Sequence, residues 1–358
     1  MVKWRDLEGT GMARMPRRYV VDDGEIGVYH CINRCVRRAF LCGTDEVSGK
    51  CFDHRKRFIQ SRLEFLAGQF GIDVLAFAVM SNHLHVVVRN RPDVVKEWSD
   101  EEVARRWWML FPKRRDDEGR PEKPRASDLS MITSDADKLA EIRGRLSNIG
   151  WFMRCVAEPV ARMANREDDC TGRFWEGRYK CQPLLDEAAL TACMAYVDLN
   201  PIRAGIAKTP ETSEFTSAAE RCARQTATSE GQRDRKRGRW LSPIPLAKRH
   251  AGKPEATPRF RASHRGCLSM SEADYLTLLD WSGRLLRRGA SGRIPDSLPP
   301  LLSRLGVTEE SWLSLIKDFG RLFHRAAGTP ASLTSEAARQ NRQWLHGTKN
   351  SRATFQSP

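Results

Sequence analysis

Residues 74–88, VLAFAVMSNHLHVVV, consist of two apolar runs separated by the polar pair Ser81-Asn82. Short apolar runs divided by a two-residue polar break are typical of a β-hairpin. We therefore expect one strand over 74–80 and a second over 83–88. A sheet that contains this hairpin is the expected centre of the fold.

Elements on both sides of the hairpin add strands and helices to this sheet. Upstream, 28–36 alternates like a strand, and apolar residues over 52–70 recur at helical spacing. Downstream, 146–163 has a helical stripe, 178–185 (RYKCQPLL) is strand-like, and Asp186 is a good N-cap for a last helix. This order predicts an α+β domain, namely a ferredoxin-like antiparallel sheet with helices on one face.

Three further segments accompany this domain. The stretch 94–145, with KRRDDEGRPEKPR at its centre, has mixed charge and is predicted to be an exposed insertion. Between 221 and 265, thirteen Lys or Arg stand against three Asp or Glu, which predicts a basic linker without a packed fold. We expect a main domain over 17–210, this linker over 211–268 and a small helical domain over 269–347.

The charge of the chain indicates its class of partner. The 358 residues include 60 Lys and Arg against 45 Asp and Glu, which gives a formal charge of +15. This balance favours a polyanion, and nucleic acid fits it better than an acidic small molecule. The sequence contains neither a signal-peptide pattern nor a run of about 18 apolar residues. We expect a cytoplasmic protein with no membrane partner.

Two histidines lie at the start of the second hairpin strand. Side chains two residues apart in a strand point to the same face, so His83 and His85 are expected to project together. Two imidazoles on one face suit a divalent cation, although two ligands leave a metal site incomplete. The alternative, and for this motif alone the more common one, is a pair of histidines whose hydrogen bonds are satisfied locally.

The stretch CMAYVDLNP, residues 193–201, places a phenol beside an amide. Tyr196 and Asn200 are four residues apart, so on a helix they lie on one flank. Small residues on that flank, such as Ala192 and Cys193, would let a bulky substrate approach the phenol. The alternative is a half-buried tyrosine beside an asparagine that ends the helix.

Four stretches together resemble the single-tyrosine HUH transposases, and most closely their REP-associated branch. YHCINR at 29–34 is similar to the opening strand of that family, and MSNHLHVVV at 80–88 to its HUH hairpin. GRFWEGRYK at 172–180 resembles its Arg-Trp-rich segment, and YVDLNPIRAG at 196–205 its tyrosine helix. The stretches occur in the family's order and cover about 17–210.

The resemblance implies a metal-dependent tyrosine transposase, an endonuclease and strand transferase for single-stranded DNA. It assigns Tyr196 as nucleophile and His83, His85 and Asn200 as ligands of Mg²⁺ or Mn²⁺, although relatives often carry glutamine at the last position. Cleavage would leave a 5′-phosphotyrosine and a free 3′-hydroxyl. The partner implied is hairpin or repeat DNA at the nucleoid, and a homodimer is one arrangement that the superfamily allows.

Basic and aromatic side chains are candidates for DNA contacts. Arg173, Trp175, Arg178 and Lys180 combine positive charge with a ring that can stack on bases, and Arg203 follows the tyrosine helix. The alternative for this segment is a Phe-Trp pair that anchors the core, with exposed basic neighbours.

Other assignments are weighed against these. Tyr179 is the second candidate nucleophile, with a half-buried sheet residue as its alternative, and His30 is expected to be structural because it is alone on its strand. A non-cleaving, sequence-specific DNA-binding protein that keeps the transposase fold is the alternative function from a different class.

Overall fold

The computed structural model describes residues 20–36, 41–44, 49–226, 238–246, 259–288 and 294–355. Its centre is a four-stranded sheet of β1 (Val28–Arg34), β2 (Ile72–Val79), β3 (His83–Asn90) and β4 (Lys180–Pro183). The strand order is β2-β3-β1-β4, and each neighbouring pair is antiparallel. The predicted hairpin and the α+β class are confirmed.

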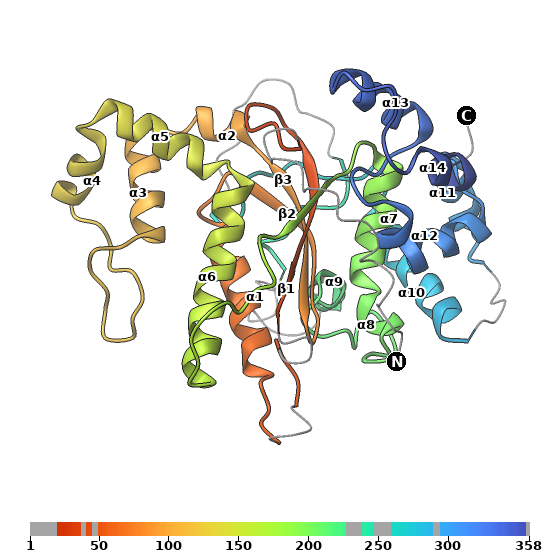
Figure 1. Cartoon of the computed structure of the whole chain (residues 1–358), viewed down its shortest axis with the longest axis horizontal. Coiled ribbons are helices and arrows are strands. Elements are labelled where there is room, and N and C mark those ends of the chain that lie inside the picture. Colours follow the sequence, from red (N-terminus) through yellow and green to blue (C-terminus); the bar gives the residue numbers. More distant parts are fainter. Residues whose placement is uncertain are drawn as a thin grey trace.

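Helices cover both faces of the sheet. On one face lie α1 (His54–Ala67) and α6 (Ile149–Glu167), and on the other lie α7 (Glu187–Asp198) and α9 (Ser217–Thr226) (Figure 1). The expectation of helices on one face is therefore wrong. All eight residues of β2 are buried because this strand packs between the two layers.

The 94–145 segment is a packed part of the domain. It forms α2 (Pro92–Lys96), α3 (Asp100–Leu110), α4 (Ala126–Thr133) and α5 (Ala136–Leu146), with α3 and α5 capped by the side chains of Ser99 and Asp135. The prediction of an exposed insertion is wrong because one face of these helices joins the core formed with α1 and α6. The residues buried there are Val103, Leu110, Leu139, Ile142 and Leu146.

The described parts of 211–268 are packed as well. Arg221 in α9 is 0% exposed and donates hydrogen bonds to the carbonyls of Leu75 and Ser242. Trp240 and Leu241 are buried in the core. The expectation that this segment lacks a packed fold is thus wrong for these parts. Arg221 was expected to carry a solvated charge, but it lies in the core and donates hydrogen bonds to buried carbonyl groups. Residues 227–237 and 247–258, which hold much of the predicted basic linker, lie outside the described residues.

The C-terminal helices cover α7. The two that contact it or the adjoining α8 (Asn200–Arg203) most are α10 (Glu272–Arg288) and α12 (Glu309–Leu322). The remaining helices are α11 (Leu298–Arg304), α13 (Pro330–Arg339) and α14 (Thr348–Thr354). One hydrophobic cluster joins β2, α7 and the C-terminal helices. The predicted domain boundaries stay a prediction.

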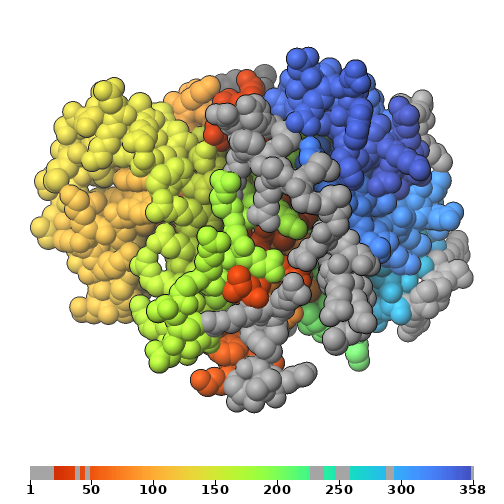
Figure 2. All heavy atoms as spheres, viewed as in Figure 1, coloured from red at the N-terminus to blue at the C-terminus, as the bar shows by residue number. Residues whose placement is uncertain are grey.

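The insertion helices and the C-terminal helices lie at opposite ends of the molecule (Figure 2). The insertion helices pack on the layer of α1 and α6, and the C-terminal helices pack on the layer of α7. No helix within the described ranges is both long enough and apolar enough to span a membrane.

Candidate active site

The sheet brings His83 and His85 to the face covered by α7. His83 is the first residue of β3, directly after the hairpin turn, and its ring centroid lies 4.7 Å from that of His85. The Nδ1 atom of His83 is 2.5 Å from the side-chain oxygen of Asn82, so this nitrogen donates a hydrogen bond. The Nε2 atom of His83 is then left with its lone pair. The predicted common face of the two histidines is confirmed.

A third imidazole, His30, completes this group from β1. Its Nε2 atom lies 2.8 Å from Nδ1 of His85, and the two rings stack with centroids 5.0 Å apart. Burial lowers the pKa of His30 to about 4 and that of His83 to about 3, so both rings are neutral at neutral pH. A neutral imidazole is the form that binds metals. The sequence prediction that His30 is alone on its strand missed this contact.

Tyr196 projects toward the histidines from α7. The helix begins where the side chain of Asp186 accepts a hydrogen bond from Ala189 N at 2.9 Å. From there Tyr196 reaches the sheet, with its ring centroid 5.8 Å from that of His85. The guanidinium carbon of Arg203 lies 4.1 Å from the centroid of the phenol ring, which puts a positive charge on its face. Residues predicted from separate motifs are thus brought together.

Asn200 lies one turn after Tyr196, at the start of α8. Its side chain is buried, and its amide nitrogen has no hydrogen-bond partner among the described residues. The carbonyl and amino ends of this side chain exchange places by rotation, so the buried end is able to present an oxygen instead. The Asn200 amide is therefore a candidate polar ligand.

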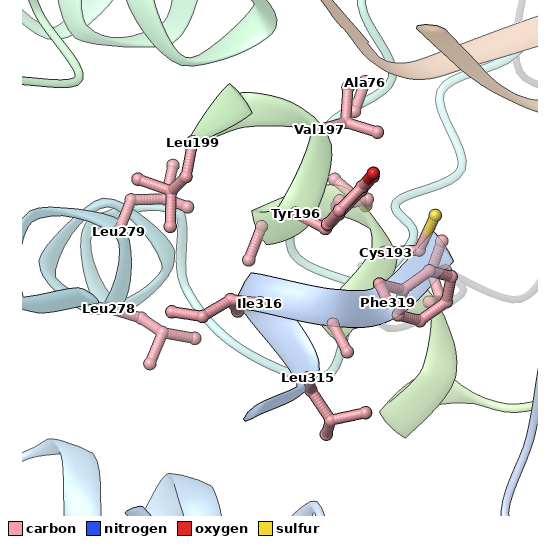
Figure 3. Packing of buried hydrophobic residues seen from close by; sticks show 14 of the residues in the cluster. Ala76, Cys193, Tyr196, Val197, Leu199, Leu278, Leu279, Leu315, Ile316 and Phe319 are labelled. Carbon is pink, nitrogen blue, oxygen red and sulfur yellow. The ribbon is translucent and has the colours of Figure 1, made fainter. Parts of the chain in front are cut away.

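Helix α12 closes this group from the C-terminal side. The ring of Phe319 lies 5.8 Å from that of Tyr196, and a Cβ atom on Gly320 would be 3.3 Å from the phenol oxygen. Figure 3 shows Tyr196 of α7 and Phe319 of α12 among the side chains packed between these helices. Tyr196 is only 3% exposed as a result. Nothing in the local sequence around Tyr196 indicated this cover.

A basic edge borders His83, the more accessible of the two hairpin histidines. After burial, the charges of Arg34 and Arg203 are the next largest contributions that lower the pKa of His83. Lys180 pairs with Ile32 across β1 and β4 and is exposed. Arg34 was not among the predicted site residues. Its position could have been found from the sequence, because residues 30, 32 and 34 share one face of a strand.

The predicted Arg-Trp segment divides into a packed part and an exposed part. Phe174 is buried in the core, and Trp175 is half-buried and donates its indole N–H to the carbonyl of Ala157 at 2.8 Å. Arg173 and Arg178 are exposed. Trp175 thus anchors the segment to α6, and a role for it in stacking on bases stays a prediction, as does DNA contact by the basic residues. Tyr179 is buried as well.

The donor types, two imidazoles and one amide, suit a divalent cation as an incomplete protein set. Among the described residues, no three His, Cys, Asp or Glu side chains form a group that could hold a metal ion. The Nε2 atom of His85 is nevertheless buried with no hydrogen-bond partner in the described chain. Two imidazole nitrogens and one amide oxygen suit Mn²⁺ and are acceptable to Mg²⁺, with water or phosphate oxygens filling the other positions.

No family model matches the chain, and no curated protein matches it. A solved structure described as a REP-associated tyrosine transposase bound to a REP hairpin is similar over 60% of this chain and 87% of its own, with 10% identity and a TM-score of 0.35. A similarity of this size does not establish a common fold.

Proposed function

We propose that this protein cleaves and rejoins single-stranded DNA at hairpin or repeat sequences, as a metal-dependent tyrosine transposase. The observation that supports the proposal is the meeting of Tyr196 with His83 and His85, which come from distant parts of the chain. The phenol ring of Tyr196, with its centroid 5.8 Å from that of His85, places a nucleophile beside neutral imidazoles that are candidate metal ligands. The net charge of +15 is consistent with a DNA partner.

The proposed reaction is a transesterification at phosphorus. The phenol oxygen of Tyr196 attacks the scissile phosphate, a bond from this oxygen to phosphorus forms, and the bond from phosphorus to the 3′ oxygen breaks. The phenol proton leaves to solvent, and the departing 3′ oxygen takes up a proton. Mg²⁺ or Mn²⁺ held by His83, His85 and Asn200 would supply Lewis-acid stabilisation of the phosphate charge.

Other residues of the chain assist this step by position and charge. The guanidinium of Arg203 lies over the phenol ring, where it stabilises negative charge on a phosphate bound to the phenol oxygen. Because the 5′-phosphotyrosine keeps the energy of the phosphodiester, attack by another 3′-hydroxyl rejoins DNA without a nucleotide cofactor.

The cover over Tyr196 sets a condition on this function. A phosphate cannot reach the phenol oxygen while Gly320 lies against it and only 3% of the residue is exposed. We therefore propose that α12 withdraws from α7 when DNA binds. The same burial favours the second candidate, a DNA-binding protein that does not cut.

A nicking and adduct assay separates the two candidates. Labelled single-stranded hairpins drawn from the DNA around the gene are incubated with the full chain and Mn²⁺, and covalent adducts are resolved on denaturing gels. Tyr196→Phe is expected to abolish the adduct while DNA binding and folding persist, because no described residue bonds to its phenol oxygen. Tyr179→Phe is the matched control and should keep the adduct, and chelation of the metal should prevent it.

An adduct that persists in Tyr196→Phe would reject Tyr196 as the nucleophile. Tight binding of a hairpin without any adduct in the wild-type chain, with either metal ion, would favour the non-cleaving protein. The absence of both binding and adduct formation across the panel would contradict both candidates.

A further inference from the structure

We propose that His30 is a positioning residue that fixes the tautomer and orientation of His85, so that Nε2 of His85 is the atom presented to a metal ion. The inference rests on the proposed function, since it concerns the metal ligands of that site. It gives a role to a side chain that the sequence resemblance leaves without one.

The hydrogen bond between the two rings requires that one of the two facing nitrogens carries a hydrogen and the other accepts it. His30 Nε2 and His85 Nδ1 are 2.8 Å apart, and the residues are 1% and 3% exposed. Because both nitrogens point at each other, neither is available to a metal ion. His30 is therefore a neighbour of a candidate ligand and not itself a ligand through this atom.

The surroundings select which ring carries that hydrogen. If it were on His30, the hydrogen of His85 would sit on Nε2, which is buried with no partner in the described chain. A buried donor left without an acceptor costs about 1–3 kcal/mol. With the hydrogen on His85 Nδ1, the Nε2 atom of His85 keeps a lone pair, which is the state that a metal ligand needs. The donor that then needs an acceptor is Nδ1 of His30, which is buried as well.

The second nitrogen of His30, Nδ1, lies near an acceptor, which also favours the tautomer with the hydrogen on His85 Nδ1. Gln182 lies directly opposite His30 across β1 and β4, and its amide nitrogen donates to the carbonyl of Phe323 at 2.7 Å. Its oxygen is then the end available to accept from His30 Nδ1. In the described chain Nδ1 of His30 makes no well-formed hydrogen bond, but the Gln182 side chain raises the pKa of His30 and so opposes part of the lowering that burial causes.

Neighbouring rings restrict His30 to this orientation. It stacks on His85 with an angle of 19° between ring planes, and the edge-on rings of Tyr196 and Phe319 lie 6.3 and 6.5 Å away. Loss of a hydrogen-bond partner of a metal-bound histidine typically weakens metal binding about 10–100-fold. We expect metal binding to weaken by the same factor when a substitution removes the hydrogen bond between His30 and His85.

Two substitutions at this position separate hydrogen bonding from packing. His30→Gln keeps an acceptor near the end of a side chain of similar reach, whereas His30→Leu fills the space without an acceptor. Mn²⁺ binding to the full chain, without DNA, is measured by electron paramagnetic resonance. We expect His30→Gln to stay within about 3-fold of wild type and His30→Leu to bind about 10–100-fold more weakly. His54→Leu, a change at an exposed histidine on α1, is the matched control and should have no effect.

The metal-free protein supplies a second measurement. Nitrogen NMR of ¹⁵N-histidine-labelled chain should show His85 with its hydrogen on Nδ1 in wild type and in His30→Gln. In His30→Leu we expect a mixture of tautomers or a shift to hydrogen on Nε2. Should the Leu variant not fold, His30→Asn replaces it, because this polar side chain is too short to reach His85 Nδ1.

The outcomes distinguish this inference from the proposed function. Equal Mn²⁺ affinity and an unchanged His85 tautomer in His30→Leu would overturn the positioning role while leaving the proposed function intact. If wild type binds no Mn²⁺, the metal site of the proposed function fails, and a His85 tautomer with hydrogen on Nε2 would overturn the inference separately. Equal weakening by Gln and Leu would show that ring packing, not the hydrogen bond, holds His85.

Discussion

The contact between Gly320 and the phenol of Tyr196 makes a double-mutant cycle informative. Replacing glycine by alanine within a helix normally raises the free energy of unfolding by about 0.5–1 kcal/mol. In α12, however, the new Cβ atom would lie 3.3 Å from the phenol oxygen and 3.9 Å from the ring carbon that carries it. The shorter distance requires the neighbouring atoms to shift by a few tenths of an ångström.

Crowding of this kind in a packed core costs about 1–3 kcal/mol, and this contact belongs at the low end because one pair of atoms is involved. We therefore expect Gly320→Ala to leave the stability of wild type nearly unchanged or slightly reduced. In the Tyr196→Phe background the oxygen is gone, and the remaining 3.9 Å contact with the ring carbon is an ordinary van der Waals distance. The same change should then stabilise the protein by about 1 kcal/mol. The expected coupling is about 1 kcal/mol.

Urea unfolding of the four proteins, followed by tryptophan fluorescence and far-ultraviolet circular dichroism, measures this coupling. The denaturant slopes must agree among the four for the free energies to be comparable. An equal effect of Gly320→Ala in both backgrounds would refute the placement of α12 against the phenol, and with it the condition that α12 must withdraw for DNA to react.

Two further predictions concern carboxylates that form hydrogen bonds with buried groups. Asp198→Ala should lower the free energy of unfolding by about 3 kcal/mol, since Asp198 accepts hydrogen bonds from Ser217, Ala218 N and Tyr275 that would be left buried and unpaired. Chemical denaturation measures this loss, and Asp280→Ala, at an exposed pair with Arg284, should change stability by no more than about 0.5 kcal/mol. Glu167→Gln should cost about 1–2 kcal/mol at pH 7 by weakening the pair with buried Arg55. Burial raises the pKa of Glu167, but hydrogen bonds from His54 and Arg55 outweigh it and hold the pKa below 4.5. The stability from this pair is thus present above pH 4.5 and lost as the pH falls through the lower folded value, so the difference between the two proteins should shrink in acid denaturation series. A constant difference down to pH 3 would contradict this assignment.

Local patterns predicted the strands and the shared face of His83 and His85, because alternation along a strand is a property of the chain itself. They did not predict which faces of the sheet are covered. An apolar run such as β2 is compatible with burial on one face or on both. The charged composition also led to the wrong prediction that these segments are not packed. Helices α3 and α5 carry many charged residues on their outer faces, and Arg221 lies wholly inside the protein.

The site was predictable where it depends on spacing within one element and unpredictable where it depends on register. The proximity of His83 and His85 follows from spacing within one strand, whereas the pairing of His30 with His85 depends on how β1 aligns with β3. The contact of Phe319 with Tyr196 depends on a helix more than a hundred residues away, and no periodicity near either residue encodes it.

The cover over Tyr196 has a consequence for DNA selection under the proposed function. Each DNA that reaches the phenol must supply the free energy that holds α12 on α7, so its apparent affinity is reduced by the fraction of molecules that are open. A closing free energy of about 3 kcal/mol would weaken every DNA by about 100-fold. Weakly held sequences would then remain largely unreacted, while a well-matched hairpin would still be captured. The helix would act as a threshold that sets how good a match must be before the DNA is cut.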